Sequence, residues 1–255
     1  MPPTYLIPAL VQSFSVIECI SENSEGVTFT DIVTETKVPK STVFRILHTL
    51  ENNSWVEKRG DRYYLGYMFI HYGLTTLSGR RIADIAGPVL DYLAEQTGET
   101  AHLAVLSGKH SMILEVRESK KHIKLTSSAG QLLPLYCTSH GKLFLAHIIG
   151  NDLEGFYFGE TLERRTEHTI TEITVLRAEL DRIRRQGYSV DNQEYQENVR
   201  CCAAPIFDRS GCIGAIGVTG TTMTCTVDRM KEISVFVKDA AAGISRQMGM
   251  VGIQD

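Results

Sequence analysis

The chain has 255 residues, of which 43% are hydrophobic and 22% charged, and its formal net charge at pH 7 is −4. This length suits two compact domains, and the composition is that of an ordinary globular protein. The acidic balance excludes a protein that is basic throughout, so any nucleic-acid binding must come from a local basic patch.

Two uncharged stretches lack the features of a membrane segment. Residues 1–17 contain three prolines and no basic residue, which argues against a signal peptide. Residues 210–227 are rich in Gly and Thr, as in a buried strand and turn rather than a membrane span. We therefore expect a cytoplasmic protein.

The six cysteines do not follow the spacing of a zinc site or a disulfide framework. None forms a Cys-x-x-Cys pair, and Cys201 and Cys202 are adjacent, which places them on opposite faces of a strand. We expect reduced and mostly buried thiols.

The first 53 residues predict three helices. Apolar residues recur at helical spacing over Leu10–Ile20. The segment Thr28–Asp31 is a helix-start signal for a short helix over 29–36. Pro39 disfavours helix at the residue before it and suits the start of a longer helix, which we expect over about 40–53. A short helix, a tight turn and a longer helix are typical of a helix-turn-helix.

The third helix has one apolar face and one polar face. Val43, Ile46, Leu47 and Leu50 share the apolar face, which predicts packing on the other two helices. Hydroxyls and cations near the start of the opposite face suit the major groove, where Arg45 can reach a phosphate or a guanine edge. The DNA contacts expected from this helix are Lys40, Ser41, Thr42, Phe44, Arg45 and His48.

Residues 55–65 predict a β-hairpin, with two aromatic-rich strands around a Gly60-Asp61 turn. Such a hairpin after the third helix is a wing. Residues 37–62 hold six basic and three acidic side chains, a local charge of +3, which leaves −7 for the remaining chain. This polarity suits a phosphate-facing module, and Lys58, Arg59 and Arg62 are the wing contacts that we expect.

The rest of the chain mixes helices with short strands. A connecting helix is expected over 66–80, and further helices over 82–97, 172–186 and 228–247. Strands are expected at about 100–106, 111–117, 122–127, 199–207 and 212–219. Strands with flanking helices predict an α/β sandwich. We therefore predict an α+β protein of two domains: a winged helix-turn-helix over 1–66, a linker helix over 67–80 and an α/β domain over 81–255.

One turn in the second domain suits a small anion. The segment Cys137–Gly141 leads into a predicted helix, and Gly141 would let a ligand approach the backbone. Free amides at a helix start, near the positive end of the dipole, favour a carboxylate.

The sequence resembles the IclR family of bacterial transcriptional regulators, and the matching motifs keep their order from residue 29 to residue 207. The N-terminal motifs are Phe29–Val33, Val38–Leu47, Trp55-Val56 and Tyr64–Gly66. The C-terminal motifs are Gly98–Val105, Leu133–Lys142, Arg184–Tyr188, Asp191–Glu194, Val199–Cys201 and Ala203–Phe207.

The resemblance implies a ligand-responsive regulator that is not an enzyme and needs no cofactor. It implies a GAF-like or profilin-like second domain, binding to double-stranded promoter DNA, and assembly as homodimers or homotetramers. Among the roles that this family serves, the resemblance favours repression of catabolic genes. The effector pocket that it implies is lined by Leu133, Ser139, His140, Gly141, Asp191, Val199, Cys201, Gly217 and Thr219. We expect a small organic acid there, either a sugar acid or an aromatic acid.

Two positions depart from the family pattern. Lys37 stands where the family usually has Gly, and a left-handed Lys costs about 1 kcal/mol, so we expect a slightly different turn. Ser139 and His140 stand where small residues are frequent, which changes the shape of the pocket.

Two other interpretations compete with a DNA-binding regulator. Cys137, His140 and Cys201 could meet in space as a metal site or a thiol-dependent sensor or enzyme. A signalling module without DNA binding would explain the second domain, but it leaves the basic segment 37–62 unexplained.

Single residues in the pocket set also have structural explanations. His102 would be a packed core histidine, Asp191 a turn cap, and Cys201 a pocket wall rather than a nucleophile. Arg200 could pair with Glu197 instead of facing a ligand.

Overall fold

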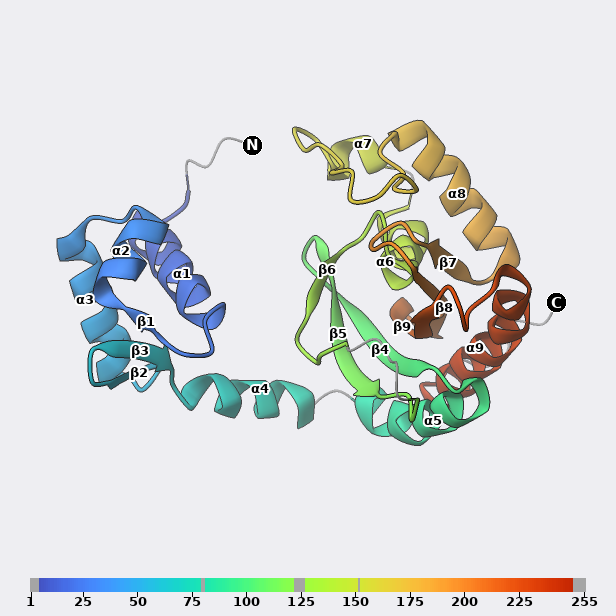
Figure 1. Cartoon of the computed structure of the whole chain (residues 1–255), viewed down its shortest axis with the longest axis horizontal. Helices are drawn as coiled ribbons and strands as arrows, with labels where there is room; N and C mark the ends of the chain where they lie inside the picture. The colour runs from blue at the N-terminus through green and yellow to red at the C-terminus, as the bar shows by residue number, and fades with distance from the viewer. Residues whose placement is uncertain (1–4, 79–80, 122–126, 151, 250–255) are drawn as a thin grey trace. The chain divides into compact units, whose positions relative to one another are not determined.

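The computed structural model describes residues 5–78, 81–121, 127–150 and 152–249. The chain divides into two compact units, residues 1–80 and 81–255. Figure 1 labels the elements of both. The elements of the first unit are α1 (Pro8–Ser21), β1 (Val27–Thr28), α2 (Phe29–Thr36), α3 (Lys40–Asn52), β2 (Val56–Arg59), β3 (Arg62–Leu65) and α4 (Met68–Ser78).

The first unit is the predicted helix-turn-helix with a wing. The Thr28 hydroxyl accepts a hydrogen bond from the Asp31 amide, and the Asp31 carboxylate accepts one from the Thr28 amide, so both cap α2. The buried face of α3 packs into one core with α1 and α2, and β1, β3 and β2 form a three-stranded antiparallel sheet. The three helices and the hairpin are confirmed.

Lys37 occupies the turn between α2 and α3. It adopts the left-handed conformation, with φ 57° and ψ 15°, and its amide donates to the Val33 carbonyl at 3.1 Å. The expectation of an altered turn is wrong: the lysine accepts the conformation that Gly would favour. Because α2 ends at Lys37 in this conformation, α3 can begin directly after Pro39. The left-handed strain at Lys37 accompanies this short turn.

The second unit begins with a long helix and continues as mixed strands and helices. Its elements are α5 (Arg81–Thr97), β4 (Thr100–Ser107), β5 (His110–Arg117), β6 (Leu132–Pro134), α6 (Ser139–Phe144), the π-helix η1 (Leu145–Ile149), α7 (Leu153–Phe156), α8 (Ile173–Gln186), β7 (Ser189–Asn192), β8 (Val199–Asp208), β9 (Gly211–Thr221) and α9 (Val227–Gln247).

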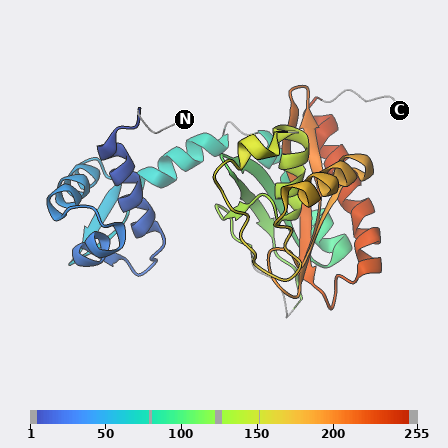
Figure 2. The same cartoon turned by 90° about the horizontal axis from the view of Figure 1, so that it is seen from above.

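One antiparallel sheet, in the order β6-β5-β4-β9-β8-β7, forms the middle layer. The helices α5 and α9 cover one face, and α9 packs along the long strand β8 (Figure 2). The segment from α6 to η1 and the helix α8 cover the other face. Alternate residues of β8 serve the two cores: Cys202 faces α9, whereas Ala203 packs with α6 and α8. The predicted α/β sandwich is confirmed.

Some local details differ from the sequence expectations. The strand expected at 122–127 falls mainly on residues 122–126, which lie outside the described residues. The helix expected from Lys142 begins three residues earlier, at Ser139, because Thr138 caps it. The short strands β6 and β7 and the helix α7 were not anticipated, since three or four residues are too few to show a period.

The state of the cysteines and the polarity of the helices agree with what the sequence predicts. All six cysteines are free thiols, four of them buried and two half-buried, as expected. Within the described ranges, no helix is both long and apolar enough to cross a membrane.

Candidate functional site

The outer face of α3 carries the residues expected to meet DNA. Lys40, Ser41, Arg45 and His48 are exposed, and Thr42 is half-buried. Phe44 is 63% exposed, and its ring stacks on His48 with 6.2 Å between ring centres. An exposed aromatic ring on this helix face can contact a thymine methyl group.

The three wing cations differ in how freely they can move. Arg62 donates to the Gly26 carbonyl at 2.7 Å, a bond that ties β3 to the loop before β1. Arg59 pairs with Glu57 at 2.8 Å and lies over the Tyr64 ring. Lys58 lies near the Tyr63 ring and forms no ion pair within the described part of the chain. Arg62 therefore also stabilises the fold of the first unit, a role that its position in the sequence does not indicate.

A cavity of about 90 Å³ opens in the second unit between the sheet and the start of α6. Seven of the nine predicted pocket residues line it, namely Leu133, Ser139, His140, Asp191, Val199, Cys201 and Thr219. Residues from β4, β5 and the turn before β8 complete the wall, among them His102, Ile113, Tyr195 and Gln196. The sequence indicated one of these residues, because His102 lies within the mainly apolar strand β4.

The two predicted glycines serve packing and do not line the cavity. A Cβ on Gly141 would lie 2.4 Å from the Leu135 carbonyl oxygen, and one on Gly217 would lie 2.5 Å from the Cys202 carbonyl oxygen. The Gly141 amide donates to the capping hydroxyl of Thr138. The structure therefore does not bring these two glycines into the cavity lining, in contrast to the sequence prediction. The Ser139 and His140 amides, in the first turn of α6, have no intrahelical partner among the described residues.

Two buried histidines form the floor of the cavity. The ring of His102 lies edge-on to that of His140, with 5.1 Å between centres. Burial lowers the pKa of His102 to about 4 and holds the pKa of His140 well below its usual range, where His102 adds to the effect. Both rings are therefore neutral at pH 7.

The two ring nitrogens of His102 differ in their partners. Nε2 lies 2.9 Å from the Thr219 hydroxyl, which itself lies 3.2 Å from the Cys201 sulfur. Nδ1 is buried with no partner among the described residues; the same holds for the Ser139 hydroxyl. Two unpaired polar atoms on the wall of one cavity favour a ligand that bonds to them.

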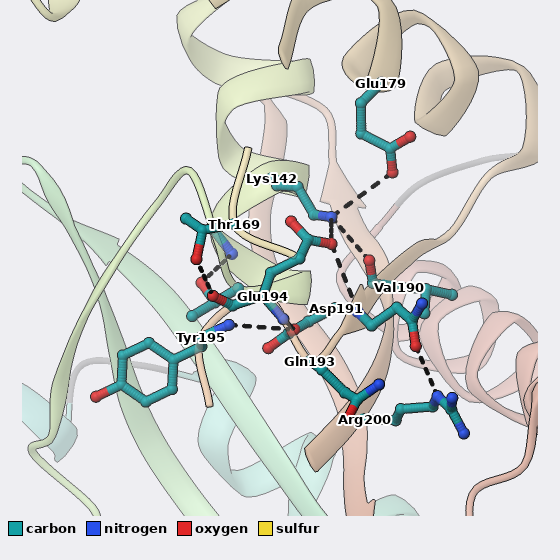
Figure 3. Close-up of polar contacts among 12 residues, drawn as sticks. Lys142, Thr169, Glu179, Val190, Asp191, Gln193, Glu194, Tyr195 and Arg200 are labelled. Carbon is teal, nitrogen blue, oxygen red and sulfur yellow. Dashed lines mark hydrogen bonds and ion pairs between the residues drawn. The ribbon is translucent and has the colours of Figure 1, made fainter. Parts of the chain in front are cut away.

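Asp191 is both a turn cap and a cavity wall. Its Oδ1 accepts from the amides of Glu194 at 2.7 Å and Tyr195 at 3.4 Å, as Figure 3 shows. Burial, and next the charge of Glu194, raise the pKa of Asp191 to about 7. The carboxyl group is thus partly protonated at neutral pH, which lowers its repulsion of an anion in the cavity.

Lys142 was named only as the end of a family motif, yet it organises this side of the cavity. Its Nζ donates to the Val190 carbonyl at 2.8 Å and to Glu194 at 2.5 Å, and it lies 3.6 Å from Glu179 (Figure 3). The Thr169 hydroxyl donates to the Glu194 carbonyl. These bonds hold the turn that carries Asp191 against α6.

The metal and thiol alternatives find no support. Among the described residues, no three His, Cys, Asp or Glu side chains lie where they could hold a metal ion. Burial raises the pKa of Cys137 to about 12 and that of Cys201 well above its usual range, so neither is a nucleophilic thiolate at pH 7. Arg200 donates to Asn192 and to the Cys225 carbonyl, and not to Glu197, the partner considered as an alternative to a ligand, within the described residues.

The sequence matches two family models. One, described as the IclR helix-turn-helix domain, covers residues 9–60, and the other, described as the bacterial transcriptional regulator IclR C-terminal domain, covers residues 74–246.

Two curated relatives span almost the whole chain. The HTH-type transcriptional regulator KdgR of Escherichia coli (strain K12) is 30% identical over 246 residues, which are 95% of this chain and 93% of that protein. The HTH-type transcriptional repressor AllR of Salmonella typhi is 27% identical over 245 residues, or 95% and 90%.

A solved structure shows the same fold. An IclR homologue from Microbacterium hydrocarbonoxydans, complexed with 4-hydroxybenzoate, aligns with a TM-score of 0.79 at 22% identity, over 94% of this chain and 98% of its own. At this identity the likeness concerns the fold alone.

Proposed function

The chain belongs to the IclR family of DNA-binding transcriptional regulators, and on this basis we propose that it represses catabolic genes and responds to a small organic acid. The relative AllR is a repressor, which supports the sign of the regulation. A helix-turn-helix unit and an effector-binding unit in one chain are the two parts that such a switch requires.

In the first unit, α3 would enter the major groove and the wing would follow the backbone. The cations of Lys40, Arg45 and Lys58 form no ion pair with any residue that the structure describes. Ser41, Thr42, Phe44 and His48 would meet base edges or phosphates. Arg59 is already hydrogen-bonded to Glu57, and Arg62 to the Gly26 carbonyl. From these fixed positions the two arginines would approach phosphates.

In the second unit, one observation carries the effector proposal: the cavity wall holds two buried polar atoms, Ser139 Oγ and His102 Nδ1, that find no partner among the residues that the structure describes. The Ser139 and His140 amides would hold a carboxylate, and Nδ1 of His102 would form a hydrogen bond with a ligand hydroxyl. Leu133, Val199 and Ile113 supply the apolar part of the wall. A hydroxylated aromatic acid has all three features, and the relative that binds 4-hydroxybenzoate supports this choice over a sugar acid.

A homodimer or homotetramer would couple the two units. A single winged helix covers one half-site, so two copies would read a near-palindrome, with α4 and α5 as the proposed contacts between copies. The effector would then change the population of arrangements whose spacing matches DNA.

Calorimetry with 4-hydroxybenzoate and with a sugar acid tests the effector proposal. We expect saturable heat with the aromatic acid and none after Ser139→Trp, which fills the cavity. The same variant should still bind promoter DNA, which shows that it is folded, but should no longer respond to the acid. The absence of saturable heat with either acid would contradict the proposal.

Promoter binding at several salt concentrations tests the DNA surface. Lys40→Ala and Arg45→Ala should each weaken binding and lower the salt slope by about one. Lys231→Ala, an exposed cation on α9, is the matched control and should change neither quantity. An unchanged affinity in the two α3 variants would mean that this helix does not face DNA.

A further inference from the structure

We propose a second ligand site in the effector-binding unit, which would take a small anion with an apolar body. A cavity of about 540 Å³ lies at the edge of the sheet between η1, α8, β8 and α9. It shares no residue with the effector cavity. The lining residues that matter to the argument are His147, Arg184, Pro205, Phe207, Lys238 and Arg246.

Unequal strand lengths create this cavity. The four residues of β7 pair with β8 only as far as Ala203, so in the described part of the chain no strand pairs with that side of β8 from Ala204 to Asp208. Pro205 has no amide hydrogen, and the Phe207 amide donates to Ser245 at 3.0 Å. An added peptide strand would find no donors at these two residues, so the edge suits a small molecule better than a strand.

The charges of the lining select an anion. Arg184, Lys238 and Arg246 are cations, and no Asp or Glu side chain of the described ranges lines the cavity. Within the described residues neither Lys238 nor Arg246 forms an ion pair, and the Lys238 ammonium lies 5.7 Å from the centre of the Tyr188 ring. Arg184 is held in place, since its Nε donates to the Ala146 carbonyl and its Nη1 pairs with Asp181.

The floor of the cavity is apolar and carries one unused polar atom. Nε2 of His147 is buried with no partner in the described part of the chain, and its ring lies edge-on to Phe207 at 5.2 Å. His147 lies within the π-helix, whose wide turn closes where the Gly150 amide donates to the Leu145 carbonyl. π-turns often occur at functional sites. An apolar body could rest on Phe207 and Pro205 while its anionic end meets Lys238 and Arg246.

One helical segment joins the two cavities. Ser139 and His140 at its start line the effector cavity, and His147 near its end lines the second. A ligand at the second site would therefore contact the same segment whose amides are proposed to hold the effector. The second site does not depend on that effector, since its own charges and apolar floor define it.

Fluorescence titration of the full chain with anilinonaphthalene sulfonate tests the site, with the uncharged phenylnaphthylamine as the matched probe. We expect saturable binding of the sulfonate and at least tenfold weaker binding of the uncharged probe. Lys238→Ala and Arg246→Ala remove exposed cations and should each weaken the sulfonate about threefold to fivefold. Arg185→Ala, an exposed cation of α8 outside the lining, should leave the affinity within twofold.

Three results would overturn the proposal. Equal binding of the two probes would show that charge does not select the ligand. Loss of sulfonate binding in Ser139→Trp, with no effect of Lys238→Ala and Arg246→Ala, would place the probe in the effector cavity. A change of oligomeric state on sedimentation of these two α9 variants, without a change in probe affinity, would make this face an interface between copies of the chain.

Discussion

The ammonium of Lys142 lies 2.5 Å from a carboxylate oxygen of Glu194, and these side chains are 0% and 8% exposed. The pair joins α6 to the turn after β7, so it holds both sides of the effector cavity together. A buried pair of this kind is strongly destabilising when only one partner is removed, because the other charge remains in an apolar environment.

Lys142→Met should therefore lower the free energy of unfolding by about 3 kcal/mol. Urea unfolding followed by circular dichroism measures this change. Lys109→Met is the control: its pair with Glu160 is half-exposed and should contribute less than about 1 kcal/mol. Equal losses in the two variants would show that burial does not set the strength of the Lys142 pair.

Lys37→Gly should stabilise the first unit by about 0.5 kcal/mol. Glycine removes about 1 kcal/mol of left-handed strain but gains about 0.5 kcal/mol of freedom in the unfolded chain. Lys37→Ala keeps a Cβ at φ 57° and should give no gain. The fluorescence of Trp55, the single tryptophan, reports unfolding of this unit. The strain argument fails if the two variants behave alike.

The buried histidines predict a loss of stability in acid. His102 has a folded pKa of about 4, below its ordinary value of 6.5, so only the unfolded chain takes up this proton as the pH falls from 6.5. The contribution of His102 to stability is therefore complete above pH 6.5 and is lost towards pH 4, by about 1.4 kcal/mol per pH unit. His140 acts in the same direction.

His102→Gln should therefore flatten the dependence of unfolding free energy on pH between 6.5 and 5. Exposed His110→Gln should keep the wild-type slope. Asp191 opposes the histidines, because its folded pKa of about 7 lies above its ordinary value, so its contribution is lost as the pH rises from 3.8 to 7. An unchanged slope in His102→Gln would mean that this ring is protonated in the folded protein.

Binding of a carboxylate effector should be coupled to proton uptake at Asp191. Its pKa of about 7 leaves part of the population ionised at neutral pH, and an entering anion favours the protonated form. Affinity should fall as the pH rises from 6 to 8, and calorimetry in two buffers of different ionisation enthalpy should show uptake of up to one proton.

Asp191→Asn should remove both effects, since the amide oxygen can still accept from Glu194 and Tyr195 without carrying a charge. Asp84→Asn, at an exposed position of α5, should retain them. Proton uptake that persists in Asp191→Asn would assign it to another group.

The sequence by itself determined the local elements and the family. Thr28, Asp31 and Pro39 act on neighbouring residues, so caps and turns could be predicted without the fold. The spaced motifs around Ser139, Asp191 and Cys201 identified most of one cavity, because a shared family fold brings such motifs together.

Only the tertiary structure decided what several of these residues do. Arg62 bonds to Gly26 and Lys142 to Glu194, pairs 36 and 52 residues apart in the chain, and no local pattern records contacts at that distance. Gly141 and Gly217 read as ligand contacts but make room for neighbouring backbone. The cavity beside β8 exists because β7 stops early, and strand pairing is a property of the assembled sheet rather than of either segment.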